Sequence, residues 1–207
     1  MLFRSPSESV GYLPESEKLV NILYLSFGQF DLYTPLQLVQ YASVIANGGV
    51  RYAPRLVKEI RNTDANGHLG GVETTIEPKV MNVVPVEKSV MDRIHEGMYQ
   101  VSHTMDGSAH YLFMNYPIKV GSKTGTDEAF YAGPIQYAAN NPVVNATYIG
   151  YAPYDKPEIA VSVVLPYLPA DATGRDSTRI ARDVMNAYFE TREATRSTIE
   201  SYKPNQP

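Results

Sequence analysis

The residues best suited to chemistry in this 207-residue chain are Lys123, Thr124, Gly125 and Thr126, which follow one another directly. Because Thr124 and Thr126 are two positions apart, both hydroxyls face the same side of a β-strand. Lys123 adds a positive charge that favours an anionic substrate and influences the proton of a nearby hydroxyl. Gly125 lets another backbone come close. A peptide can therefore lie beside this segment as an added strand, with its terminal carboxylate near the hydroxyls and the ammonium.

The elements that must position these residues include three predicted strands, over residues 118–123, 145–151 and 158–165. The second strand alternates between apolar and polar residues, whereas the third is almost continuously apolar, as expected of a buried strand. A long loop is predicted over residues 127–142. Long loops are often functional, so this one either lines a substrate groove or is a mobile connection.

Helices are predicted before and after these strands. Thr34 is a good N-cap and Pro35 is tolerated in a first helical turn, so a helix begins there. It ends at Asn47-Gly48-Gly49, because glycine accepts the left-handed conformation after a helix. Residues 87–101 and 173–189 carry apolar residues at helical spacing.

Two further strands, over residues 52–61 and 72–84, are predicted to form a hairpin, because Asn66-Gly67 between them is a turn signal. Residues 19–27 form a short apolar strand or helix that Gly28 breaks. The order of helix, hairpin, helix, three strands and helix predicts an α+β fold, with helices packed against an antiparallel sheet.

By composition we divide the chain into a partly irregular N-terminal segment, residues 1–27, a main body, residues 28–193, and a polar tail, residues 194–207. The net charge of −4, with no Lys/Arg cluster, argues against nucleic acid as a partner. The absence of cysteine excludes disulfides and thiol catalysis. No apolar run approaches the roughly 20 residues that span a membrane, and the first residues lack the apolar core of a signal peptide.

Several spaced motifs of the chain resemble the C-terminal half of the transpeptidase domain of class B penicillin-binding proteins. In one respect the sequence departs from that family, since Ser122 precedes the lysine where the family usually has glycine. The motifs that carry the resemblance are Gly28-Gln29, Thr34 to Leu38, Ala46 to Gly49, Lys123 to Thr126, Ala146 to Pro153 and Pro157 to Val164.

The resemblance implies a cell-wall enzyme that binds D-Ala-D-Ala stem peptides and β-lactams and cross-links peptidoglycan through a serine acyl-enzyme. By this resemblance Lys123 assists proton transfer, and Thr124, Gly125 and Thr126 bind the substrate carboxylate end. The backbone N–H of Thr126 is implied as one of two oxyanion-hole donors. The parent protein is implied to be anchored in the bacterial cytoplasmic membrane, with this domain outside. No metal or organic cofactor is implied.

Two other elements of such sites, S-x-x-K and S-x-N, occur nowhere in the sequence. We therefore expect the nucleophile to lie outside this chain, which alone is then inactive and needs the N-terminal half of the domain as a partner. Without that half, one apolar sheet face is expected to be uncovered and to drive dimerisation or domain swapping. The alternatives are a fragment of a serine β-lactamase or β-lactam sensor, or a non-catalytic peptide-binding module.

Overall fold

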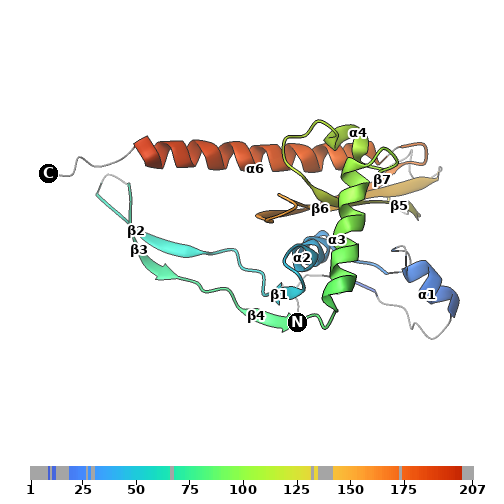
Figure 1. Cartoon of the computed structure of the whole chain (residues 1–207), viewed down its shortest axis with the longest axis horizontal. Helices are drawn as coiled ribbons and strands as arrows, with labels where there is room; N and C mark the ends of the chain where they lie inside the picture. Colours follow the sequence, from blue (N-terminus) through green and yellow to red (C-terminus); the bar gives the residue numbers. More distant parts are fainter. Residues whose placement is uncertain are drawn as a thin grey trace.

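The body of the protein is a three-stranded antiparallel sheet between helices. A computed structural model describes residues 9, 11–12, 19–26, 28, 31–65, 68–131, 133–134, 142–172 and 174–201. The sheet has the order β5 (Gly121–Ala129), β6 (Val143–Ala152) and β7 (Ile159–Pro169), with β6 in the centre (Figure 1). The predicted α+β arrangement of helices on an antiparallel sheet is confirmed.

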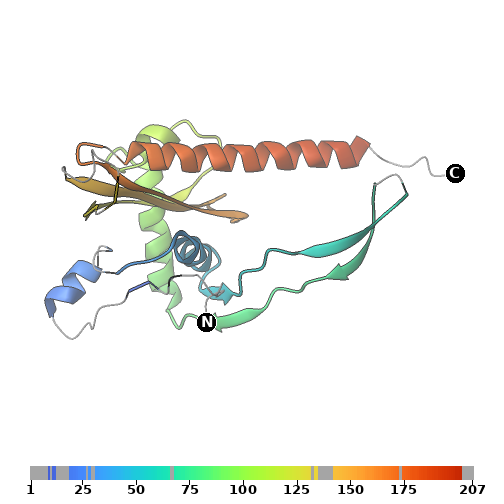
Figure 2. The same cartoon turned by 180° about the vertical axis from the view of Figure 1, so that it is seen from behind.

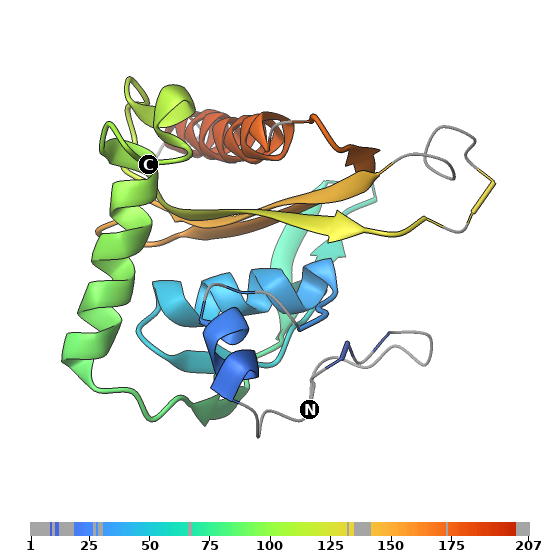
Figure 3. The same cartoon turned by 90° about the vertical axis from the view of Figure 1, so that its right-hand side faces the viewer.

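Helices lie on both faces of this sheet. On one face are α4 (His110–Phe113), a single turn that the sequence pattern did not predict, and the long α6 (Arg175–Ser201). On the opposite face α2 (Pro35–Ala46) packs against β6 and β7 (Figure 3). Helix α3 (Lys88–His103) stands at the side and contacts β5, while α1 (Leu19–Leu25) lies beyond α2.

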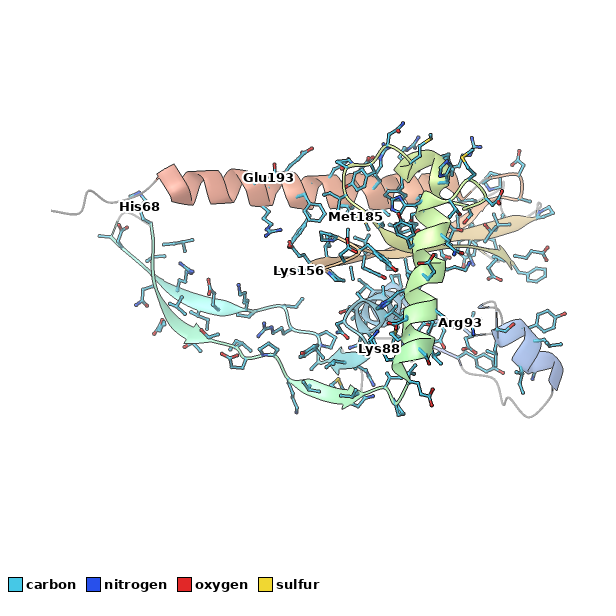
Figure 4. All side chains as sticks on the ribbon, viewed as in Figure 1. His68, Lys88, Arg93, Lys156, Met185 and Glu193 are labelled. Atoms are coloured by element: carbon cyan, nitrogen blue, oxygen red, sulfur yellow. The ribbon has the colours of Figure 1, made fainter. Side chains whose placement is uncertain are left out.

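The central strand β6 is buried because its alternate side chains enter two different cores. Tyr148 and Ala152 point to the α4/α6 side, where Met185 of α6 is fully buried (Figure 4). Tyr151 points to the α2/α3 side. The buried members of the first core are Ala109, Phe113, Val120, Tyr148, Ala152, Val161, Ala181 and Met185. Those of the second core are Ile45, Met91, Met98 and Tyr151.

The prediction that the third strand is the buried one is therefore wrong. β7 is the second edge of the sheet, and most of its side chains are only half-buried, although its sequence is almost continuously apolar. β6 alternates in sequence yet contacts strands on both sides and helices on both faces. Burial here follows position in the sheet rather than the hydrophobic pattern of the strand.

The predicted start and end of α2 are confirmed in atomic detail. The Gln37 N–H donates to Thr34 Oγ1 at 3.3 Å, and the Thr34 N–H donates to Gln37 Oε1 at 2.8 Å, which completes a capping box. After the helix, Gly48 and Gly49 have φ angles of 79° and 111°. A side chain at either position would be strained, so glycine is needed to end the helix here.

Helix α6 is longer than predicted. The apolar spacing indicated an end at Phe189, followed by a frayed polar tail, but the helix continues to Ser201. Residues 190–201 contain no glycine or proline, and the Arg192 guanidinium forms an ion pair with Glu158 beside β7. The absence of these helix-breaking residues and the ion pair allow the helix to continue past its apolar face.

The predicted hairpin forms a projecting arm that is broken into two pairs of strands (Figure 2). β2 (Glu59–Thr63) pairs with β3 (Leu69–Thr75) at the tip, and β1 (Val50–Tyr52) pairs with β4 (Val80–Val83) at the base. Pro54 and Pro78 lie between the two pairs and have no N–H to donate to a ladder. The Asn66-Gly67 turn lies outside the described residues.

The loop after the binding strand is shorter than predicted, because β5 continues through Asp127 to Ala129. The described residues of the remaining connection are few, and its Tyr137 lies outside them. Gly28, expected to break the first apolar segment, has a φ angle of 88° three residues after α1 ends.

The expected uncovered apolar sheet face is not present among the described residues, since helices cover β6 on both sides. What stays open is the outer edge of β5 and of β7. No helix in the described part of the chain is long and apolar enough to cross a membrane.

Candidate functional site

Lys123, Thr124, Gly125 and Thr126 lie in the middle of β5, as the sequence predicted for a binding strand. Within the described residues β5 pairs with β6 alone, so its outer edge has no strand neighbour. Helix α3 covers the start of β5 at Ser122, and the edge is open from Lys123 onward. A free edge presents unpaired N–H and C=O groups, to which an extended peptide can add as a further strand.

The four residues divide between the two faces of the sheet. Thr124 lies opposite Tyr148 and Thr126 opposite Ala146, so both hydroxyls belong to the α4/α6 face. Lys123 lies opposite Ile149 and belongs to the other face. A ligand can therefore reach the ammonium and both hydroxyls only at the free edge of β5, where the two faces meet.

Gly125 is required by its neighbour on β6. A Cβ at this position would lie 2.3 Å from Oγ1 of Thr147, which is the residue directly opposite. A larger residue would therefore displace β5 from β6 or move the threonine, and either change would shift the edge that carries the hydroxyls. Gly121 meets a similar limit, because its Cβ would lie 2.6 Å from the ring of Tyr151.

The charged end of Lys123 is exposed and rests on the strand's own backbone. Its Nζ donates to the Thr124 carbonyl oxygen at 2.5 Å. The described residues provide no carboxylate ion pair for this ammonium. It is thus held against the backbone of β5 and can attract an anion at this edge.

The end of α3 and the turn that follows hold β5 through side-chain hydrogen bonds that the sequence did not reveal. The hydroxyls of Ser102 and Ser122 are 2.6 Å apart and fully buried. The hydroxyls of Ser108 and Thr124 are also 2.6 Å apart. These contacts join residues 20 and 16 positions apart, so no local motif signals them. The buried contact with Ser102 also explains why a small polar residue, Ser122, precedes Lys123.

His103, at the end of α3, supports the segment that leads into β5. The Val120 N–H donates to its Nε2 at 3.0 Å, which requires that nitrogen to be unprotonated. Burial lowers the pKa of His103, and the positive charge of Lys119 lowers it further. The ring also packs against Tyr99 at a centroid distance of 4.6 Å.

No cluster of three or more histidine or acidic residues that suits a metal ion occurs in the described ranges. Besides His103, two histidines have side-chain contacts of a structural kind. His95 Nε2 lies 2.7 Å from the Ile45 carbonyl, and His68 pairs with Asp64 near the tip of the arm, far from β5 (Figure 4).

Comparison with known proteins agrees with this arrangement. A family model described as the penicillin-binding protein transpeptidase domain matches residues 2–186. The chain belongs to this family. The predicted resemblance to a penicillin-binding transpeptidase domain is therefore confirmed, and the sheet, its helices and the K-T-G-T strand are parts of such a domain.

Three similar proteins illustrate the relation of this chain to the family. It is 40% identical over 187 residues to penicillin-binding protein 2A of Bacillus subtilis, covering 89% of this chain and 26% of that protein. It is 24% identical over 143 residues to the peptidoglycan D,D-transpeptidase MrdA of Escherichia coli, covering 64% of this chain and 21% of MrdA. The structure of penicillin-binding protein 2B from Streptococcus pneumoniae aligns with a TM-score of 0.71 and 37% identity, over 90% of this chain and 29% of that one. This chain thus spans about a quarter of the length of the curated relatives it matches.

Proposed function

We propose that this chain is the C-terminal portion of a peptidoglycan D,D-transpeptidase and forms the carboxylate-binding wall of its active site. The observation that carries the proposal is the free β5 edge, which presents Lys123, Thr124 and Thr126 in a chain of the transpeptidase family. The substrate is a stem peptide that ends in D-Ala-D-Ala, or a β-lactam whose carboxylate imitates that end.

In this proposal the substrate lies along β5 as an added strand. The Thr124 and Thr126 hydroxyls donate to its carboxylate, and Lys123 supplies the opposite charge and assists proton transfer at the nucleophile. Gly125 allows the two backbones to approach. The backbone N–H of Thr126 stabilises the oxyanion that forms at the attacked carbonyl.

The nucleophilic serine comes from residues outside this chain, in the full-length protein that contains it, called the parent below. The serine attacks the penultimate D-Ala carbonyl, the bond to the terminal D-Ala breaks, and that residue leaves with a proton on its nitrogen. The amine of a second stem peptide then displaces the serine and completes the cross-link. The parent is anchored in the cytoplasmic membrane with this domain outside, where its substrate lies.

The proposed partner of this chain is the N-terminal half of the domain, which covers the outer edge of β7 and an exposed apolar stripe on α6. The outer edge of β7 has no strand neighbour among the described residues. Ile180, Val184 and Tyr188 lie four residues apart along α6 and are 39%, 44% and 36% exposed. A strand edge beside an apolar stripe favours association, so the isolated chain dimerises, swaps elements or needs that half for solubility. A monodisperse monomer by light scattering at micromolar concentration would contradict this part of the proposal.

The proposal is tested by covalent labelling with a fluorescent penicillin, read by intact mass. The isolated chain, the parent and the parent with Thr124→Val are compared, because valine keeps the shape of threonine and lacks its hydroxyl. We expect one acyl adduct on the parent, none on the chain, and slower labelling of the variant.

Other outcomes separate the alternatives. Acylation of the isolated chain would place the nucleophile among its own serines. Rapid loss of the adduct by hydrolysis would favour a serine β-lactamase. A stable adduct without any cross-linking of stem peptides would favour a β-lactam sensor. If the parent is not acylated at all, a non-catalytic peptide-binding module becomes the better account of the free β5 edge.

A further inference from the structure

We propose that Ser108 is a positioning residue that orients the Thr124 hydroxyl toward the substrate carboxylate. The inference rests on the proposed function, in which Thr124 binds that carboxylate. Its basis is the hydrogen bond of 2.6 Å between the two hydroxyl oxygens, made across the interface between the turn after α3 and strand β5.

The contact is the last of three that occur at every second residue, from Val120, just before β5, to Thr124. His103 accepts from the backbone N–H of Val120, Ser102 meets Ser122, and Ser108 meets Thr124. Thr126, two residues further along, has no such contact from the turn and is exposed. The interface thus reaches the first of the two substrate hydroxyls and stops there.

Ser108 is held in a turn that the end of α3 fixes on both sides. Before it, Gly107 packs so closely that a Cβ would lie 2.4 Å from the carbonyl oxygens of Gln100 and Val101. After it, the Ala109 N–H donates to the Val101 carbonyl at 3.0 Å, and Ala109 is fully buried. A hydroxyl between two anchored residues has a defined place, whereas one on a free loop does not.

The chemistry assigns a direction to the hydrogen bond. A carboxylate only accepts hydrogen bonds, so Thr124 must donate its single hydroxyl hydrogen to the ligand. The Ser108 hydroxyl then donates to Oγ1 of Thr124, which accepts without losing its own hydrogen. Hydrogen bonds in such a chain polarise one another, so the donation also strengthens the bond from Thr124 to the carboxylate.

The test is a double-mutant cycle in the parent, with the second-order rate of acylation by a fluorescent penicillin as the readout. The variants are Ser108→Ala, Ser108→Thr, Thr124→Val and the double variant Ser108→Ala/Thr124→Val. Thr104→Ala is the matched control, because Thr104 lies in the same turn and its hydroxyl donates only to the Gln100 carbonyl. Thermal unfolding of each variant is measured alongside.

We expect Ser108→Ala to slow acylation about five-fold, the factor that one neutral hydrogen bond is worth. Ser108→Thr keeps a hydroxyl and stays within about two-fold of the wild-type rate, as does Thr104→Ala. The double variant labels no more slowly than Thr124→Val alone, because Ser108 acts only through the Thr124 hydroxyl.

Three results would overturn the positioning role while leaving the proposed function intact. The first is a wild-type rate of acylation for Ser108→Ala. The second is an equal loss of rate for Thr104→Ala and Ser108→Ala. The third is a double variant that is acylated a full five-fold more slowly than Thr124→Val alone. A parent that is not acylated, or a Thr124→Val variant that labels at the wild-type rate, would instead overturn the assignment of Thr124 and the positioning role with it.

Discussion

The sheet body and the projecting arm are both built from antiparallel strands, yet their side chains have opposite surroundings. In β6 every side chain is at least half-buried, and helices lie on both faces. In β2 and β3 nearly every side chain is exposed, including Leu69 at 75%. The strands of both regions pair antiparallel, although the pairing of β2 with β3 shifts register at two places and that of β5 with β6 is regular. Only the body adds helices that cover the strands.

This difference in packing also explains what stabilises β5. A two-stranded ribbon by itself is marginally stable in water, whereas strands with covered faces gain the free energy of apolar burial. β5 belongs to the body, and α3 and β6 hold it from two sides. The site should therefore respond strongly to changes in the body and hardly at all to changes in the arm.

The largest effect is expected from Phe113→Ala in the parent protein. Phe113 is fully buried between α4 and the sheet, where its ring packs against Tyr148. Removing it leaves a cavity and should lower the free energy of unfolding by about 3–5 kcal/mol. Chemical denaturation measures this loss. A change below about 1 kcal/mol would mean that the body is not the stabilising region.

Gly125→Ala should cost about 1–3 kcal/mol of unfolding free energy, because its Cβ would overlap Oγ1 of Thr147. A second substitution, Thr147→Ala, removes that oxygen and should recover most of the loss. Gly71→Ala in β3 is the matched control in the arm, since a Cβ there meets nothing within 4 Å. The measurement is the thermal unfolding of Gly125→Ala, Thr147→Ala, the double variant and Gly71→Ala. Equal losses at Gly125 and Gly71 would contradict the steric explanation.

The body should also lose stability in mild acid through His103. Its pKa is lowered in the folded state by burial and by Lys119, so the unfolded state binds the proton more tightly. Stability is therefore fully present above the unfolded value of about 6.5 and declines as the pH falls through the folded pKa. His103→Gln should flatten the pH dependence of the melting temperature in this range. If the melting temperature of the variant depends on pH as in the wild type, other titratable groups cause the loss of stability in acid.

The smallest effect is expected from Leu69→Ser in the arm. The side chain is 75% exposed, so the change should alter the free energy of unfolding by no more than about 0.5 kcal/mol. Acylation of the parent should be unchanged as well. A loss as large as that of a core residue would reveal that the arm is buried in the full protein, against a segment outside this chain.

Local signals in the sequence predicted much of the fold, and they predicted a strand at the candidate site. Thr34-Pro35 and Asn47-Gly48-Gly49 determine both ends of α2, because capping and positive φ angles depend on neighbouring residues alone. The residues that lead into Lys123-Thr124-Gly125-Thr126 predicted a strand over 118–123, and β5 begins within that range, at Gly121. The ends of strands were harder to predict. β5 runs six residues beyond its predicted end, because β6 pairs with it throughout.

Only the tertiary structure decided which strand is central, which edge is free and which hydroxyls meet. β7 has the more apolar sequence but lies at the edge, and β6 is buried because neighbours surround it. Ser108 meets Thr124 from a turn 16 residues away, a contact that no spacing rule contains. The sequence by itself determined the residue types at the site and the local turns and caps. Long-range packing determined their surroundings, because a side chain's burial and partners depend on chain segments that are remote in sequence.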